Sequence, residues 1–187
     1  GKLTGYRKMA ESVINLVGKQ LQQEDGRTFP YSSTKEIRIS GGDVGGSEGF
    51  KKFIEQKIVE GVKLGIEKHQ AEHLVKRYGS NVEVIFDMYQ DLKEKAQVEG
   101  IDPVIFTVLH YSIEYESVFK PIDFFIRRTG DLFFNIRSVE EQKKQIVMYM
   151  SKILNWSDEQ MKDYTKELDQ LLFEAKHAVE VENLSVE

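Results

Sequence analysis

The sequence contains no cysteine, only three prolines among its 187 residues, and no long apolar run. The absence of cysteine excludes disulfides, thiolate zinc sites and cysteine nucleophiles, and it fits a reducing compartment. No apolar stretch approaches the roughly 20 residues that span a bilayer, and the N-terminus does not resemble a signal peptide. We therefore expect a protein without a transmembrane segment, in the cytoplasm or peripheral to the membrane.

Excess positive charge is also absent, because 26 Lys and Arg stand against 31 Asp and Glu, for a net charge of −5. A mildly acidic chain lacks the basic surface that nucleic-acid binding requires, so we expect no nucleic-acid partner. Hydrophobic residues make up 40% of the chain, which is enough for a folded core. The chain also begins without methionine, which predicts a fragment of a longer protein.

Apolar residues recur at helical spacing along most of the chain, and no βαβ alternation or internal repeat is visible. The pattern predicts an all-α fold, a compact bundle of about seven or eight helices. The predicted helices cover residues 6–23, 47–64, a short segment ending at 78, 81–98, 103–118, 121–126, and two long segments that follow Ser138 and Ser157.

Helix boundaries are indicated by capping residues. Asp102 before Pro103 is a strong helix start, and Ser138 and Ser157 each open a predicted capping box. Thr4 and Asn81 are further predicted N-caps, since short polar side chains accept hydrogen bonds from the first free N–H groups. Gly79, which follows the short helix, suits a left-handed C-cap.

Residues 24–46 differ from the rest of the chain. They combine an alternating stretch at 35–39 with the glycine-rich run 41–46, which predicts a flexible insert holding a loop or short hairpin. A phosphate-binding loop would need lysine directly after its last glycine, whereas here Lys51 comes five residues after Gly46. An anion at the N-terminus of the following helix stays open as an alternative. The predicted organisation is thus 1–23, 24–46 and 47–187.

The four histidines offer little chemistry. His69 and His73 are spaced for a metal on one helix face, but Glu72 does not complete a His-Glu-x-x-His motif, so an exposed helical pair is the favoured interpretation. His110 lies among apolar residues, which favours a hydrogen-bonded core histidine over a catalytic one. We predict neither a metal site nor a catalytic residue in this chain.

Two adjacent arginines, Arg127 and Arg128, follow a short apolar segment. A partly buried guanidinium needs an acidic partner, and Glu116 and Asp123 lie upstream at suitable distances. We predict a structural ion-pair network of these four residues. The aromatic residues between Tyr111 and Phe134 are predicted to be core, since no basic residues alternate with them as in a base-stacking surface.

Three stretches resemble FAD-dependent glycerol-3-phosphate dehydrogenases and oxidases. Gly1–Glu11 resembles the end of their FAD-binding domain, which typically reads Gly-Gly-Lys-Leu-Thr-Thr-Tyr-Arg before a helix, although Gly5 replaces the second threonine. His73–Ser80 resembles their Arg-Tyr-Gly turn. Glu116 through Asp123 to Thr129 resembles their C-terminal helical domain, where an acidic residue precedes Asp-x-x-x-Arg-Arg-Thr.

This resemblance implies a C-terminal helical domain that follows an upstream FAD-binding domain. The parent enzyme would oxidise sn-glycerol 3-phosphate to dihydroxyacetone phosphate with FAD as hydride acceptor. Lys2, Leu3 and Thr4 would contribute to the flavin and substrate site, because a helix N-terminus offers N–H groups to the negative charge of reduced flavin. The chain itself lacks a Gly-x-Gly-x-x-Gly motif, so we expect it to be structural and inactive alone.

The stretch Ile39–Gly46 resembles the bacterial oxidase branch, which passes electrons to O2 and forms H2O2. A quinone-linked dehydrogenase remains the alternative within the family. The alternative outside it is a stand-alone helical interaction or scaffold module without catalysis, in which the match at Lys2–Thr4 would be accidental. The coding sequence upstream of residue 1 separates these two interpretations.

Overall fold

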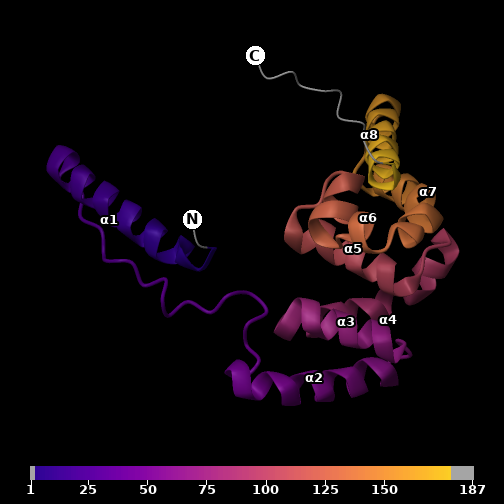
Figure 1. Cartoon of the computed structure of the whole chain (residues 1–187), viewed down its shortest axis with the longest axis horizontal. Helices are drawn as coiled ribbons and strands as arrows, with labels where there is room; N and C mark the ends of the chain where they lie inside the picture. Colours follow the sequence, from indigo (N-terminus) through magenta and orange to yellow (C-terminus); the bar gives the residue numbers. More distant parts are fainter. Residues whose placement is uncertain (1–2, 178–187) are drawn as a thin grey trace.

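The computed structural model describes residues 3–177, and its regular secondary structure is entirely helical (Figure 1). The prediction of an all-α fold is confirmed. The eight α-helices of this range are α1 Tyr6–Asp25, α2 Gly46–Lys63, α3 Lys68–Tyr78, α4 Val82–Glu99, α5 Pro103–Glu116, α6 Asp131–Phe134, α7 Ile136–Ile153 and α8 Asp158–Lys176. Shorter turns are the 3-10 turns η1 Leu3–Gly5 and η2 Gly79–Asn81, and the π-helical turn η3 Asp123–Arg128.

Helices α2 to α8 pack into one bundle, whereas α1 lies apart from it at the end of a long coil (Figure 1). In the bundle, α2 lies along α3, and α4 lies along α5. Helices α6 and α7 continue the stack, and α8 packs on both of them. Residues 26–45 therefore connect α1 to the bundle.

The core begins at Ile66 and ends at Leu172, and its largest fully buried side chains include Phe86, Phe106 and Tyr149. Helix α2 covers this core with partly buried residues and with Gly61. A Cβ at Gly61 would lie 2.9 Å from both Ala71 Cβ and the Phe86 ring. Glycine at this position therefore lets α2 approach α3 and α4 closely.

Two of the predicted helix starts are confirmed. Asp102 Oδ1 accepts from the backbone N–H groups of Val104 at 2.9 Å and Ile105 at 3.0 Å, with Pro103 as the first helical residue. Ser157 and Gln160 form the reciprocal capping box, with contacts of 3.1 Å and 2.9 Å. These caps can be predicted from local sequence, because all their hydrogen-bond partners lie within three residues.

Ser138 and Thr4 are not caps, whereas Asn81 and Gly79 lie at the predicted cap positions without the predicted capping geometry. Helix α7 begins two residues before Ser138, after Asn135, so Ser138 lies inside its first turn. Asn81 is the residue before α4, as predicted, but its side chain accepts no capping hydrogen bond; its amide nitrogen donates to Ser40 Oγ at 2.7 Å. Thr4 lies in η1, and Gly5 is the residue that precedes α1. Gly79 has a positive φ of 53° but a ψ of −133°, which is not the left-handed helical conformation.

Residues 26–45 contain no strand, so of the two predicted forms of the insert the loop is present and the short hairpin is not. A turn at Thr34–Glu36 and a second at Ser40–Gly41 interrupt an otherwise extended coil. The alternating residues Ile37 and Ile39 stay 64% and 73% exposed, so no neighbouring strand or core surface covers them. Helix α5 also ends earlier than predicted, at Glu116, because Ser117 takes a left-handed conformation with φ 58°.

Among residues 3–177, no helix combines the length and apolar character needed to cross a bilayer.

Candidate functional site

The N-terminal motif lies directly before α1. Lys2 falls outside the described residues, while Leu3 and Thr4 form the exposed start of η1, with Leu3 89% exposed. No side chain caps the start of α1, and its first turn contains no acidic residue but holds Arg7 and Lys8. The first N–H groups of α1 and the positive end of its dipole therefore remain available to an anion.

Helix α1 presents a face that the described chain does not cover. None of its 20 residues is buried. Its large apolar side chains are between 41% and 63% exposed, namely Tyr6, Met9, Val13, Ile14, Leu16 and Val17. A contiguous apolar face of this kind on a helix indicates a surface that another protein part covers. Within the described range, part of the coil lies beside α1: Thr28–Tyr31 line a groove of about 520 Å³ along it, and Thr34 accepts a hydrogen bond from Arg7 at 3.4 Å.

The two arginines of the predicted ion-pair network each have a separate partner. Arg127 pairs with Asp123 one turn away, within η3. Arg128 donates to the Glu116 carbonyl at 2.7 Å and lies 3.7 Å from the Glu116 carboxylate. The four residues thus form two pairs that tie η3 to itself and to the end of α5.

Asp123 also shapes the backbone before η3. Its Oδ2 accepts from the N–H groups of Lys120 at 2.9 Å and Phe119 at 3.2 Å. Burial pushes the pKa of this carboxyl upward, but these two N–H groups and Arg127 outweigh burial and leave the pKa below its usual value. Asp123 is therefore ionised at neutral pH and closes the turn that follows Val118.

The histidines have ordinary structural surroundings. His110 Nε2 lies 2.7 Å from the Tyr149 hydroxyl, as expected for a hydrogen-bonded core histidine. Burial and then Lys95 lower the pKa of His110 to about 4, so its imidazole is neutral at pH 7. His69 is exposed beside Glu67, and His73 lies 3.3 Å from Arg77. In the described range, no three His, Asp or Glu side chains gather as metal ligands would.

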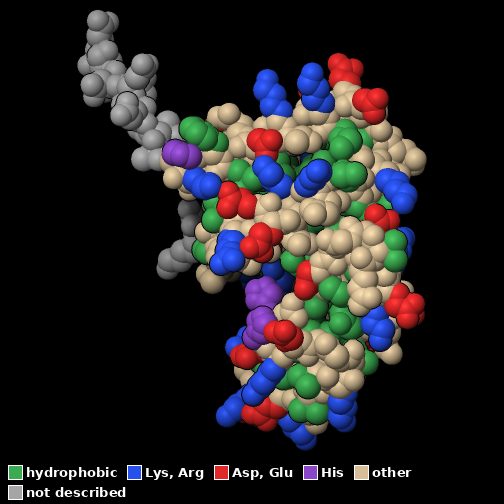
Figure 2. Space-filling model, turned by 90° about the vertical axis from the view of Figure 1, so that its right-hand side faces the viewer, with side chains coloured by type: hydrophobic (Ala, Val, Ile, Leu, Met, Phe, Trp, Pro, Cys, Tyr) green, Lys and Arg blue, Asp and Glu red, His purple; other side chains and the backbone are tan. Residues whose placement is uncertain are grey.

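A cleft of about 1040 Å³ separates α3 from α5, α6 and α7. Its lining mixes the histidines of α3 with Arg77, Asp131 and the 90% exposed Phe134. Figure 2 shows the hollow at the waist of the molecule, with histidine side chains at its edge. The polar groups of this lining carry both signs and do not converge on one point, so the cleft has no identifiable catalytic centre.

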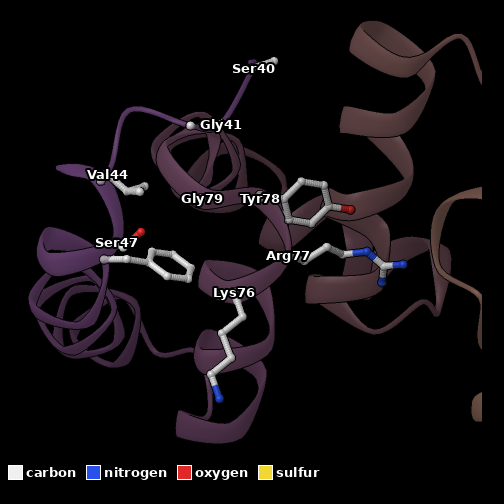
Figure 3. A pocket seen from close by; sticks show the side chains of 11 residues that line it. Ser40, Gly41, Val44, Ser47, Lys76, Arg77, Tyr78 and Gly79 are labelled. Carbon is white, nitrogen blue, oxygen red and sulfur yellow. The ribbon is translucent and has the colours of Figure 1, made fainter. Parts of the chain in front are cut away.

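The glycine-rich loop meets the end of α3 at a smaller pocket of about 380 Å³, lined by Ser40, Gly41, Val44, Lys76 and Tyr78 among others (Figure 3). Lys76 points away from the loop and pairs with Glu72 at 2.5 Å. Lys51, the lysine considered for a phosphate loop, is exposed on α2 and does not line this pocket. The loop therefore supplies no lysine to a phosphate, which disfavours the phosphate-loop alternative.

Sequence reasoning missed this meeting of the loop with the Arg-Tyr-Gly turn. Each segment is recognisable as a turn, but about 40 residues separate Gly41 from Ser80, and the glycines bring the two backbones directly against each other. The sequence feature that could have predicted this contact is the pair Gly41 and Gly79, because glycine allows two backbones to approach closely.

Comparison with known proteins identifies the domain. The family model for the C-terminal domain of alpha-glycerophosphate oxidase matches residues 32–161. The aerobic glycerol-3-phosphate dehydrogenase of Staphylococcus saprophyticus is 44% identical over 176 residues, and that of Staphylococcus haemolyticus is 42% identical over 175. Both matches cover 94% of this chain and 31% of the relative, so the chain spans about a third of the length of these curated relatives.

A solved structure agrees with the sequence match. The glycerol-3-phosphate dehydrogenase from Bacillus halodurans, complexed with FAD, superposes with a TM-score of 0.86 and 37% identity, covering 96% of this chain and 35% of that protein. The similarity thus includes α1 and the coil as well as the bundle. On the fold, the family match and these relatives together, the chain belongs to the family of the C-terminal domain of alpha-glycerophosphate oxidase.

Proposed function

We propose that this chain is the C-terminal helical part of an enzyme that oxidises sn-glycerol 3-phosphate to dihydroxyacetone phosphate with FAD. The observation that carries the proposal is the match over 96% of this chain to a glycerol-3-phosphate dehydrogenase complexed with FAD. Bound FAD supplies the hydride acceptor. The chain's own residues supply the uncapped start of α1, which suits the negative charge of a reduced flavin.

Within that enzyme, Lys2, Leu3 and Thr4 form part of the wall of the flavin and substrate site. Leu3 and Thr4 place backbone N–H groups before α1, and Lys2 adds a positive charge beside the flavin or the substrate phosphate. The exposed position of η1 and the absence of acidic residues from the first turn of α1 support this role. The remaining helices brace the enzyme, and the Asp123–Arg127 and Glu116–Arg128 pairs serve structure.

The partner of α1 is the FAD-binding part of the same longer protein. The six exposed apolar residues of α1 support this assignment, as does the chain's coverage of only a third of its relatives' length. The 187-residue chain should therefore neither retain FAD nor oxidise glycerol 3-phosphate. Its absorbance near the flavin bands after gel filtration with excess FAD tests this point, and a yellow, active fragment would contradict it.

The final electron acceptor of the longer enzyme is proposed to be O2, with H2O2 as product, in the cytoplasm or at the membrane surface. The resemblance of Ile39–Gly46 to the oxidase branch supports oxygen, whereas the relatives' names describe dehydrogenases. Peroxide formed per glycerol 3-phosphate oxidised under air measures the acceptor directly. A stoichiometry near one supports the oxidase, and turnover that depends on an added quinone supports the dehydrogenase.

A further inference from the structure

The turn at Arg77–Asn81 contacts three separate segments of the chain through successive residues. Arg77 donates from Nη2 to the Arg128 carbonyl at the end of η3. The Tyr78 ring packs edge-on against Tyr111 of α5, with ring centroids 5.2 Å apart. Figure 3 shows both side chains pointing away from the glycine-rich loop, toward the bundle. The bundle side of this turn is therefore firmly held.

The opposite side of the turn receives the glycine-rich loop, backbone against backbone. A Cβ at Gly41 would lie 2.5 Å from the Tyr78 carbonyl oxygen, and a Cβ at Gly79 would overlap the Gly41 carbonyl. Both glycines also have positive φ, 80° at Gly41 and 53° at Gly79. No other residue allows this approach, since any side chain at either position meets backbone atoms that cannot rotate away.

Polar contacts then fix the register of the two segments. The Ser80 N–H donates to the Gly41 carbonyl at 3.0 Å, and the Asn81 amide donates to Ser40 Oγ at 2.7 Å. The Asp43 N–H lies 3.3 Å from Ser80 Oγ. Two consecutive residues of the turn, Ser80 and Asn81, thus make three hydrogen bonds to the loop, although the two segments lie about 40 positions apart.

We propose that Ser40–Asp43 and Gly79–Asn81 form a latch that fixes where the coil from α1 joins the bundle. The role of the latch rests on the proposed function. In the longer enzyme, Gly41, Gly79 and Asn81 are positioning residues, because they act through the coil and α1 on the proposed flavin-site segment at Leu3 and Thr4. It gives the Arg-Tyr-Gly turn and the glycine-rich loop a common role, which neither has as an isolated motif.

The first test uses the 187-residue chain and hydrogen exchange of individual amides. In Gly41→Ala the Ser80 N–H should lose its acceptor and exchange roughly tenfold faster, while amides of α4 and α5 keep their rates. Gly26→Ala is the matched control, because Gly26 has a similar φ of 68° but nothing within 4 Å of an added Cβ. Equal exchange at Ser80 in the two variants would overturn the latch.

A milder pair of variants checks the same contact without backbone strain. Ser40→Ala and Asn81→Ala each remove the 2.7 Å hydrogen bond, so their effects on Ser80 exchange should fail to add in the double variant. Full additivity would show that the two side chains act independently and would count against the latch. Circular dichroism confirms that each variant keeps its helices.

The second test uses the longer enzyme and addresses positioning. Gly41→Ala should lower kcat roughly 10-fold to 100-fold, as expected when a reacting segment is displaced by about an ångström, with a smaller change in KM. It should also shift the flavin absorbance spectrum, which a purely structural role would leave in place, and Gly26→Ala should do neither. Faster Ser80 exchange with unchanged kcat and spectrum would overturn the positioning role.

Failure of the latch and failure of the proposed function give different results. If the unmodified longer protein does not oxidise glycerol 3-phosphate, the proposed function fails and with it the positioning role, while the exchange data still decide the latch. If the enzyme is active but Gly41→Ala matches Gly26→Ala in exchange and in kcat, the latch fails and the function stands.

Discussion

Helices α1 and α7 are built alike and placed differently. They span 20 and 18 residues, and each carries apolar side chains at helical spacing along one side. Helix α7 buries five of them, Val139, Ile146, Val147, Tyr149 and Met150, whereas α1 buries none. The apolar stripe of a helix therefore predicts that a face will be covered, but it does not say by which part of a protein.

The free energy of burying apolar side chains shows that the exposed face of α1 favours a covering partner. Fully covering a large apolar side chain stabilises a protein by about 1.5–3 kcal/mol, so six such residues left about half exposed on α1 represent a substantial unused stabilisation. A family whose members are about three times longer than this chain offers an evident cover for that face. The contrast between the two helices should accordingly disappear in the longer protein.

The largest expected effect separates the two regions in the isolated chain. Phe106→Ala, at a fully buried position of α5, should lower the free energy of unfolding by about 3–5 kcal/mol, because it leaves a cavity in the core. Leu16→Ala, at a 57% exposed position of α1, should change it by less than about 0.5 kcal/mol. Urea unfolding followed by circular dichroism measures both. Similar losses would mean that α1 is packed after all.

The next effect tests whether the longer protein covers α1. Ile14→Asp should leave the isolated chain unchanged, but it should cost the longer enzyme about 2–3 kcal/mol, because the carboxylate then enters an apolar interface. Thermal unfolding of both proteins and flavin retention by the longer one provide the comparison. Lys19→Asp, on the same helix at an exposed position, serves as the charge control. Equal tolerance of both changes in the longer enzyme would refute the assignment of α1's partner.

In the bundle, His110 makes the free energy of unfolding depend on pH. His110 has a folded pKa of about 4 against an ordinary 6.5, so the unfolded chain binds the extra proton and stability falls as pH drops from about 6.5 to 4. Since His110 is only partly buried, we expect about 1–2 kcal/mol over this window after allowing for solvent screening. His110→Gln should flatten this part of the curve of unfolding free energy against pH. An unchanged slope would assign the loss to other groups.

The smallest effect compares the starts of two helices. Asp102→Ala removes the acceptor of two backbone N–H groups at the start of α5 and should cost about 1 kcal/mol. Thr4→Ala should cost the isolated chain nothing measurable, because Thr4 is not the cap of α1. Thermal unfolding of the two variants is sufficient. A loss at Thr4 equal to that at Asp102 would show that the start of α1 is capped in solution.

Local sequence predicted the parts of this fold whose partners are also local. The caps Asp102 and Ser157 bond to residues within three positions, and the core residues of α3 to α8 recur at helical spacing. A short window of sequence therefore contains what is needed to predict these helices and their caps. The resemblance to the family then supplied the identity of the domain, which composition and periodicity alone left as a helical bundle of unknown role.

The wrong or missing predictions share a different cause. Asn81 precedes α4 as predicted, but its side chain makes no capping hydrogen bond and its amide nitrogen donates to Ser40, which is distant in sequence. Ser138 resembles a cap, but the short helix α6 turns the chain so that α7 starts earlier, at Ile136. The Gly41–Gly79 contact depends on two backbones meeting, and a single sequence gives no pattern for such an encounter.

The contact at Gly41 also changes how α1 is tethered. The coil between Asp25 and Gly46 has 20 residues, but the part between α1 and Gly41 has only 15. The glycine-rich loop therefore shortens the stretch of chain that joins α1 to the bundle, without adding any contact to α1 itself.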